Sequence, residues 1–264
     1  MRKCSFPSFR FPGKIILLFV CMIGVLTTLS AQTNVQYVAI RTGLNMRDKP
    51  EASAKVLEKI PYGTKISLLD NNEEMLTIRT EGILGYWRKV KYNNKTGYII
   101  DSYLFPVAPP KATVKTMKEY MAQISVPFGS KLVVKSGTMN NVEDGGWELH
   151  KQLYKNGAEW HEVKGYEYGS NIFILPDFTI KQAFLLLRMI PEFKDAIGTT
   201  DEFPTVTKTI KKGEIDYYYK VETEELTEEP WIKRINIDFG DGAVYSLEIT
   251  QFDNQVVIYY GSGV

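Results

Sequence analysis

The two histidines of the chain lie on either side of a predicted hairpin. His150 and His161 begin and end the stretch HKQLYKNGAEWH, whose Asn-Gly dipeptide favours a two-residue turn between strands. Such a turn places Gln152 opposite His161. Because alternate residues of a strand share one face, His150, Glu159 and His161 would then lie together. Two imidazoles and a carboxylate form a ligand set that zinc accepts.

The alternative for this hairpin is a solvated polar face, with Leu149, Leu153 and Trp160 directed to the core. Histidines and carboxylates on one face of a strand are ordinary surface residues, and we favour this interpretation. We therefore expect no bound metal and no cofactor. The two histidines and Glu159 remain as minor metal candidates.

A nucleophile for covalent catalysis is not evident in the sequence. Cys4 and Cys21 are the only cysteines and fall in an N-terminal segment that we predict to be removed. A serine nucleophile would need a histidine base, and the G-x-S-x-G motif of many serine hydrolases is not present. We predict that the protein is not an enzyme.

Two further motifs have ordinary structural explanations. The stretch DFGDG (Asp238 to Gly242) resembles part of a calcium loop but lies between two alternating strands, which favours a glycine turn. The stretch DYYYK offers Tyr217 or Tyr218 as a stacking surface. Tyrosine is common in strands, so we expect packing instead.

The first 31 residues are typical of a secretory signal peptide. They hold four basic residues and no acidic ones, then an apolar run from Ile15 to Leu29, then small residues up to Ala31. The apolar run is shorter than the roughly 20 residues that span a bilayer. We predict cleavage after Ala31, export to the periplasm or beyond, and a mature chain that has no cysteine and does not span the membrane.

The charge balance argues against a nucleic-acid ligand. Four of the 32 basic residues lie in the predicted signal peptide, so the mature chain has 28 basic against 31 acidic residues. Nucleic-acid binding needs a clustered basic face, and we predict no such partner.

A proline-rich stretch divides the mature chain. FPVAPPK, from Phe105 to Lys111, holds three prolines in five residues, which exclude a helix or an inner strand. We predict one domain over residues 34–106, a linker over 107–112 and a second domain over 113–264 that folds separately.

The two predicted domains differ in their patterns. Residues 34–106 show short apolar stretches separated by turn residues, which indicates a small all-β barrel or sandwich. Residues 113–264 show two helices, one over 114–124 and one that starts at a Thr179–Gln182 capping box and ends at Pro191. Alternating strands follow these helices, which indicates an α+β domain with antiparallel sheets. In one of them Trp231, Ile235, Ile237 and Phe239 alternate with Ile232, Arg234, Asn236 and Asp238, which predicts one buried face.

Residues 36–105 resemble the bacterial SH3-like domain family. The resemblance lies in LNMRDKP, in a following valine and glycine, in WRKV, in a Gly-Tyr strand and in the closing SYL. The matching positions are Leu44, Asn45, Arg47, Pro50, Val56, Gly63, Trp87, Lys89, Val90, Gly97, Tyr98, Tyr103 and Leu104. The resemblance implies a small β-barrel that binds cell-wall peptidoglycan or a peptide. We expect Gly63 to adopt a positive φ and Gly97 to leave space for Trp87.

Tyr86 and Arg88 depart from the family pattern, which has glycine and often an aromatic residue there. Strand alternation places these two side chains opposite Trp87, which we expect to be packed. The predicted ligand-binding residues are therefore Arg47, Tyr62, Tyr86 and Arg88.

The sequence thus favours an exported, non-catalytic cell-envelope protein. Its SH3-like domain would bind a cell-wall glycopeptide or a peptide, and its second domain would bind or scaffold something else. Two alternatives remain: a cell-wall hydrolase that acts through the second domain, and a secreted interaction or inhibitor-like protein whose SH3-like domain is only structural.

Overall fold

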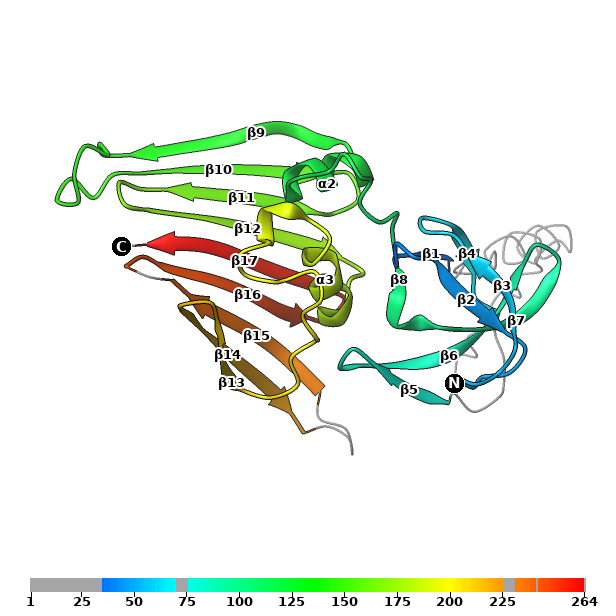
Figure 1. The fold of residues 1–264 in the computed structure, drawn as a ribbon. Coiled ribbons are helices and arrows are strands. Elements are labelled where there is room, and N and C mark those ends of the chain that lie inside the picture. Colours follow the sequence, from blue (N-terminus) through cyan, green and yellow to red (C-terminus); the bar gives the residue numbers. More distant parts are fainter. Residues whose placement is uncertain (1–34, 70–75, 226–230, 241, 264) are drawn as a thin grey trace, which may run out of the picture. The chain divides into compact units, whose positions relative to one another are not determined.

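The computed structural model describes residues 35–69, 76–225, 231–240 and 242–263 (Figure 1). Residues 34–264 form one compact unit. The predicted signal peptide lies outside the described residues. Within them the fold is predominantly β, with antiparallel sheets and two α-helices. None of the helices in the described part has the length and apolar composition needed to cross a membrane.

The N-terminal segment (residues 35–105) forms two antiparallel sheets. One has the order β4-β1-β8 and the other the order β3-β2-β7-β6-β5. The strands are β1 (Val35–Val38), β2 (Leu44–Arg47), β3 (Val56–Ile60), β4 (Lys65–Ser67), β5 (Thr77–Thr80), β6 (Ile83–Tyr92), β7 (Lys95–Ile100) and β8 (Leu104–Phe105). A 3-10 turn, η1 (Asp101–Tyr103), joins β7 to β8. Gly63 has φ of 75°, as predicted.

The C-terminal segment (residues 113–263) is built on one nine-stranded antiparallel sheet. Its order is β13-β14-β15-β16-β17-β12-β11-β10-β9. The strands are β9 (Pro127–Ser136), β10 (Trp147–Tyr154), β11 (Glu159–Lys164), β12 (Tyr168–Pro176), β13 (Lys208–Lys212), β14 (Ile215–Glu224), β15 (Trp231–Phe239), β16 (Val244–Phe252) and β17 (Gln255–Gly263).

Both helices lie on the same face of this sheet (Figure 1). Helix α3 (Ile180–Leu187) has the predicted capping box between Thr179 and Gln182, and Ile180, Phe184 and Leu187 are buried. Helix α2 (Met117–Ile124) begins three residues later than predicted, at a second capping box. The 3-10 turn η2 (Pro191–Phe193) follows α3. The apolar sides of these elements and the sheet face beneath them make the core.

The alternation of β15 holds for most of its length. Ile235, Ile237 and Phe239 are buried beneath the helices, as the period of two predicts. Trp231 was expected on the same face but is 39% exposed. The pairing with β14 slips by one residue at Lys233, and this bulge interrupts the alternation between Ile235 and Trp231.

Several contacts connect the N-terminal segment to the C-terminal segment. Gln182 Nε2 donates to Leu104 O at 2.8 Å, and Lys181 Nζ donates to Leu84 O at 2.8 Å. The rings of Phe105 and Phe178 lie 5.6 Å apart. The predicted linker is also held, because Tyr120, Gln123 and Tyr62 donate hydrogen bonds to the carbonyls of residues 108–110.

Candidate functional site

Strand β6 divides the predicted ligand-binding residues between its two sides. Trp87 is only 7% exposed, which confirms that it is largely packed. Tyr86 and Arg88, its neighbours, are half-buried and point away from it because side chains alternate along a strand. The two sides of β6 therefore face two different pockets.

The Arg47–Trp87 pocket lies on one side and has a volume of about 350 Å³. Arg47 Nη1 donates to Ala54 O at 2.6 Å, which fixes the guanidinium against the loop after β2. Trp87, Lys59 and Tyr103 are among the other residues that line this pocket. Arg47 is thus not near Tyr86 or Arg88.

The structure gives a different reason for the glycine at position 97 from the one that we predicted. It pairs with Val90, and a Cβ at this position would lie 2.6 Å from Arg47 O and 2.7 Å from Met46 Cγ. The missing side chain therefore lets β2 cross close to β7 and does not make space for Trp87.

The side chain of Tyr62 makes its contacts away from both pockets. Its hydroxyl donates to Pro110 O at 2.7 Å, and the Arg41 guanidinium carbon lies 5.4 Å from the centre of its ring. Burial raises the pKa of its phenol. Tyr62 thus holds the predicted linker and does not join the other three predicted residues.

The β6–α3 cavity lies on the Tyr86 and Arg88 side and has a volume of about 230 Å³. Both segments contribute to it. Its lining consists of Gln36, Leu68, Ile83, Leu84, Tyr86, Arg88, Asp101, Ser102, Leu104, Thr179, Lys181 and Gln182.

Three buried polar atoms of this cavity have no hydrogen-bond partner among the described residues. They are Gln36 Oε1, Arg88 Nε and Ser102 Oγ. A buried polar atom without a partner costs about 1–3 kcal/mol, and such atoms are rare in folded proteins. The three together make this cavity the candidate binding site among the described residues.

Gly85 makes room for the polar wall of the cavity. It is buried in β6, and a Cβ there would overlap Ser102 Oγ and lie 2.8 Å from Asp101 Oδ1. Only a residue without a side chain lets η1 lie this close to β6. The stretch GYW therefore positions Ser102 and Asp101 beside Tyr86.

Asp101 is the acidic group of the cavity. Its Oδ1 accepts a hydrogen bond from Tyr86 N at 2.7 Å. Burial raises the pKa of this carboxyl, and the Tyr86 hydrogen bond and the charges of Arg88 and Lys181 oppose that effect only in part. The cavity thus offers an acceptor at Asp101 beside the donors of Arg88.

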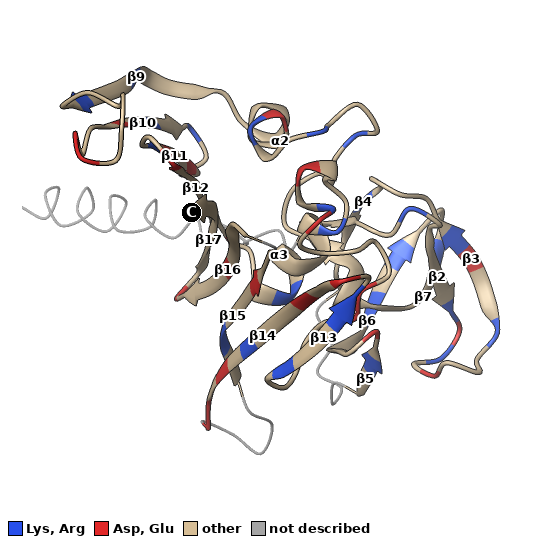
Figure 2. Ribbon diagram, turned by 60° about the vertical axis from the view of Figure 1, so that its left-hand side comes forward, with Lys and Arg blue, Asp and Glu red and all other residues tan. Residues whose placement is uncertain are grey.

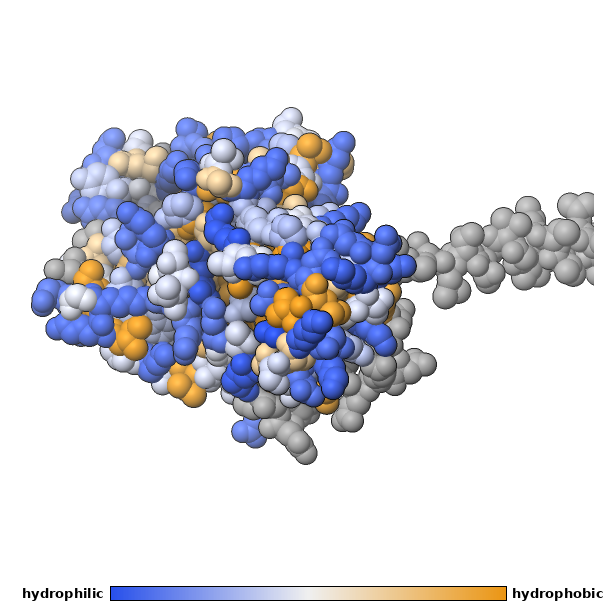
Figure 3. Space-filling model, turned by 45° about the vertical axis from the view of Figure 1, so that its right-hand side comes forward, coloured by the Kyte–Doolittle hydropathy of each residue, from blue (hydrophilic) through white to orange (hydrophobic). Residues whose placement is uncertain are grey.

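A larger groove of about 790 Å³ adjoins the cavity and shares Leu84, Tyr86, Thr179 and Lys181 with it. We call it the Trp231 groove. Its remaining lining is Arg79, Gly82, Ile180, Phe203, Thr205, Val206, Thr223, Trp231, Ile232, Gln251 and Asp253. Val206 and Trp231 are exposed there. Figure 3 shows one face of the molecule, which is mostly hydrophilic with separate apolar patches.

The histidine hairpin has a register that differs by one residue from the predicted one. Leu153 pairs with Glu159, and Tyr154 N donates to Ala158 O at 2.9 Å, so the three residues 155–157 form the turn. Gly157 adopts φ of 83°. His150 consequently pairs with Glu162, and His161 pairs with Lys151. The two histidines lie on opposite faces of the sheet, so the minor alternative of a metal site built from both of them with Glu159 is wrong.

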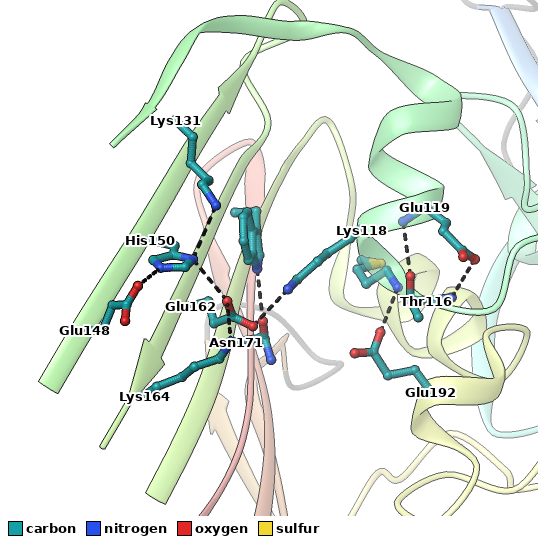
Figure 4. Close-up of polar contacts among 12 residues, drawn as sticks. Thr116, Lys118, Glu119, Lys131, Glu148, His150, Glu162, Lys164, Asn171 and Glu192 are labelled. Atoms are coloured by element: carbon teal, nitrogen blue, oxygen red, sulfur yellow. Dashed lines mark hydrogen bonds and ion pairs between the residues drawn. The ribbon is translucent and has the colours of Figure 1, made fainter. Parts of the chain in front are cut away.

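Each histidine has its own acidic neighbours. His150 contacts Glu148 and lies 3.4 Å from Glu162 Oε2, on the face that α2 covers (Figure 4). Lys118 of α2 also reaches this face, where its Nζ lies 4.0 Å from the ring centre of Trp160. On the other face His161 Nε2 lies 2.9 Å from Glu159 Oε2.

Trp160 faces α2, as predicted, whereas Leu153 is 37% exposed on the opposite face and not in the core. The described residues contain no group of three acidic, histidine or cysteine side chains that could hold a metal ion.

Sequence reasoning identified Tyr86 and Arg88 but missed their partners. Gln36, Ser102 and Lys181 lie far apart in the chain, so only the tertiary fold brings them together. Ser102 belongs to the closing SYL motif, but that motif does not indicate its neighbours. Gly85 was the one available signal, because a glycine within a strand often marks a close approach.

Comparison with known proteins supports one part of the chain. No curated protein and no solved structure matches it. A family model, the bacterial SH3 domain, matches residues 42–105, about a quarter of the chain, and the C-terminal part has no family match. Residues 42–105 are thus a bacterial SH3 domain, as the motifs from LNMRDKP to SYL indicated.

Proposed function

We propose that this protein is an exported, non-catalytic cell-envelope protein that binds a cell-wall glycopeptide or a peptide in the β6–α3 cavity. The observation that carries the proposal is the set of three unpartnered polar atoms in that cavity. Bacterial SH3 domains typically bind cell-wall ligands, which supports this class of ligand. The signal-peptide pattern of residues 1–31 supports export.

The three atoms favour a ligand group that both donates and accepts hydrogen bonds. Arg88 Nε can only donate, Gln36 Oε1 can only accept, and Ser102 Oγ can do either. A phosphate or carboxylate could accept from Arg88 but would face the acceptors of Gln36 and Asp101. An amide group, as in a peptide or an N-acetylated sugar, matches both kinds of atom.

The Trp231 groove extends the site for the rest of such a ligand. It is continuous with the cavity through Leu84, Tyr86, Thr179 and Lys181. Aromatic side chains at the edge of a groove provide contact area for the apolar faces of sugars and peptides. Tyr86 lines both spaces and would bridge the two parts of the ligand.

The C-terminal segment has a direct role in this proposal. Thr179, Lys181 and Gln182 at the start of α3 form one wall of the cavity. The segment would therefore complete the binding site of the SH3 domain, in addition to any scaffolding role.

The proposal is tested by binding of residues 32–264 to purified peptidoglycan sacculi. We expect Arg88→Ala to weaken binding about tenfold or more, because one hydrogen bond from a charged group contributes about 1.5–3 kcal/mol. Arg47→Ala is the matched control, since it removes the same group from the other pocket. Melting curves of both variants check the fold.

Three outcomes would contradict the proposal. Wild-type protein that does not bind sacculi would leave the SH3 domain a structural role. Equal binding by wild type and Arg88→Ala, with loss in Arg47→Ala, would place recognition in the Arg47–Trp87 pocket. A cleared band on a peptidoglycan zymogram would favour the hydrolase.

Asp101 gives the site a predicted pH dependence. Its pKa in the folded state is raised above the ordinary value of 3.8. The folded protein therefore holds this proton more tightly, and the cost of the buried charge disappears as the pH falls through the raised pKa. Asp101→Asn keeps an oxygen that can accept from Tyr86 N but does not titrate.

We therefore expect Asp101→Asn to melt at a higher temperature than wild type at neutral pH. The difference should shrink as the pH falls toward 3.8. Differential scanning calorimetry across this range checks the prediction. A difference that stays constant with pH, or that grows at acidic pH, would contradict the assigned direction of the pKa shift.

A further inference from the structure

The Arg47–Trp87 pocket combines positive charge with an apolar lining. Arg47 and Lys59 supply two cations, and none of the residues that line the pocket is acidic. The β6–α3 cavity differs in this respect, because Asp101 is part of its lining. The large apolar side chains of the Arg47–Trp87 pocket are those of Ile40, Leu44, Ile78, Trp87 and Ile100. A pocket of this composition fits a ligand that has both an anionic and an apolar part.

Neither cation of the pocket has an ionic partner in the protein. A neighbouring lysine shows the contrast, because Lys95 Nζ lies 3.1 Å from Glu58 Oε2. Arg47 and Lys59 form no ion pair with an acidic residue in the described part of the chain. The attraction between opposite charges grows where apolar surroundings lower the effective dielectric constant. The two charges are therefore available to an anion that enters the pocket.

The guanidinium of Arg47 is held in place and still has donors to offer. Its Nη1 donates to Ala54 O at 2.6 Å, which uses one of the five N–H groups of a guanidinium. Within the described residues the side chain forms no other hydrogen bond. A planar guanidinium matches the two oxygens of a carboxylate. Arg47 is thus suited to bind a carboxylate without first giving up a partner.

A glycine keeps Lys59 at the pocket. Gly43 has φ of 82°, a conformation that glycine adopts without strain. A Cβ at Gly43 would lie 3.3 Å from both Cγ and Cε of Lys59 and 3.0 Å from Ile60 O. The missing side chain therefore lets the stem of Lys59 lie against the turn between β1 and β2. Both residues line the pocket.

The size of the pocket limits the ligand. Its volume of about 350 Å³ is close to the lower end of the roughly 300–1,000 Å³ that small-molecule sites occupy. Inorganic phosphate would match the charges but would leave the apolar side chains without a partner. A small molecule that also has an apolar group removes that surface from water, which is favourable.

We propose that the Arg47–Trp87 pocket binds a small organic acid. Its carboxylate is held by Arg47 and Lys59, and its apolar group packs against Trp87 and the neighbouring isoleucines. The C-terminal residue of a peptide offers the same chemistry as a free acid of this size. The inference does not rest on the proposed function, because this pocket and the β6–α3 cavity lie on different sides of β6.

The charge distribution along the chain agrees with an anionic ligand for this segment. Residues 34–105 hold 11 basic and 8 acidic residues, whereas residues 106–264 hold 17 basic and 23 acidic ones. Figure 2 shows basic residues on β3 and β6, the strands of Lys59 and Trp87. Surface charge of one sign steers ligands of the opposite sign. An organic acid is therefore attracted to the N-terminal segment and repelled by the C-terminal one.

The experiment is a nuclear magnetic resonance titration of residues 32–264, which contain the whole compact unit. The reporters are the backbone amides of Gly43 and Asn45 and the indole N–H of Trp87, all of which line the pocket. We expect N-acetylleucine to shift these signals progressively. N-acetylleucinamide has the same apolar group without the charge, and we expect it to bind at least tenfold more weakly.

Two lysine variants test the role of the charge. Lys59→Ala should weaken the binding of N-acetylleucine by about three- to fivefold, and it keeps the hydrogen bond between Arg47 and Ala54. Lys55→Ala is the matched control, because Lys55 is also exposed but does not line the pocket. It should bind N-acetylleucine as wild type does. Both side chains are exposed, so the melting temperatures of both variants should stay close to that of wild type.

Three results would overturn the proposal. The first is a titration in which N-acetylleucine leaves the three reporter signals unchanged. The second is equal binding of the acid and its amide, which would leave the cations without a role. The third is an equal response to inorganic phosphate, which would make the pocket a simple anion site.

An acetylated tripeptide that ends in leucine distinguishes the two sources of the ligand. Binding at least as tight as that of N-acetylleucine would support the proposal with a peptide C-terminus as the ligand. Weaker binding than that of N-acetylleucine would support it with a free acid.

Discussion

Trp87→Ala is expected to lower the free energy of unfolding by about 3–5 kcal/mol, the usual cost of removing a buried aromatic side chain. The side chain is 7% exposed and lies in β6, between β5 and β7. Its removal would leave a void that opens into the Arg47–Trp87 pocket. Small domains have little stability to spare, so we expect the SH3 domain to melt first. Thermal melting followed by circular dichroism measures the effect.

Tyr86→Ala is the matched control from the next position of the same strand. Tyr86 is half-buried and lines the β6–α3 cavity, so its loss should change stability by less than about 1 kcal/mol and weaken binding to sacculi. The opposite pair of results would overturn the assignment: a stable Trp87→Ala that no longer binds, beside a Tyr86→Ala that binds normally. Recognition would then belong to the Arg47–Trp87 pocket.

Local sequence signals predicted most of the elements correctly. The Thr179–Gln182 capping box marked the start of α3, and the alternation of Ile235, Ile237 and Phe239 marked the buried face of β15. Such signals work because a cap and a strand period involve only neighbouring residues.

The errors arose where one extra residue changed a register. An Asn-Gly dipeptide suits a two-residue turn, but here it forms the end of a three-residue turn, with Gly157 in the left-handed region. This single step moved His161 to the face opposite His150. The bulge at Lys233 interrupted the alternation of β15 before Trp231, which is 39% exposed. The period of a strand is two, so any slip by one residue exchanges the faces.

The candidate site was only half predictable for a related reason. Tyr86 and Arg88 were identified because they depart from the motif of a family. Ser102 and Asp101 depend on the close approach of η1 to Gly85, and Lys181 depends on the packing of α3. Pairings over such distances in the chain leave no local pattern in a single sequence.

Residues 34–106 expressed alone are expected to fold but to be much less stable than the same residues in the full chain. The sequence predicts a separately folding unit, which would give a β-type spectrum and a cooperative melt. In the full chain, however, Phe105 is fully buried and packs against Phe178, and Leu104 is 2% exposed. Exposure of each of these side chains costs about 1.5–3 kcal/mol, so the fragment could lose up to about 3–6 kcal/mol.

Three polar contacts are lost as well. Leu104 O loses the Gln182 amide, Leu84 O loses the Lys181 ammonium, and Glu81 loses the Arg188 guanidinium, which lies 2.6 Å away. The melting temperature of the fragment, compared with that of residues 32–264 under the same conditions, measures the combined loss of stability from these apolar and polar contacts. Phe178→Ala in residues 32–264 is the control that removes one apolar contact without cutting the chain. Its melting temperature should lie between that of the fragment and that of wild-type residues 32–264. A fragment with the same melting temperature as residues 32–264 would show that these contacts add no stability. An unfolded fragment would show that the SH3 domain depends on α3 for its fold as well as for the wall of its proposed binding site.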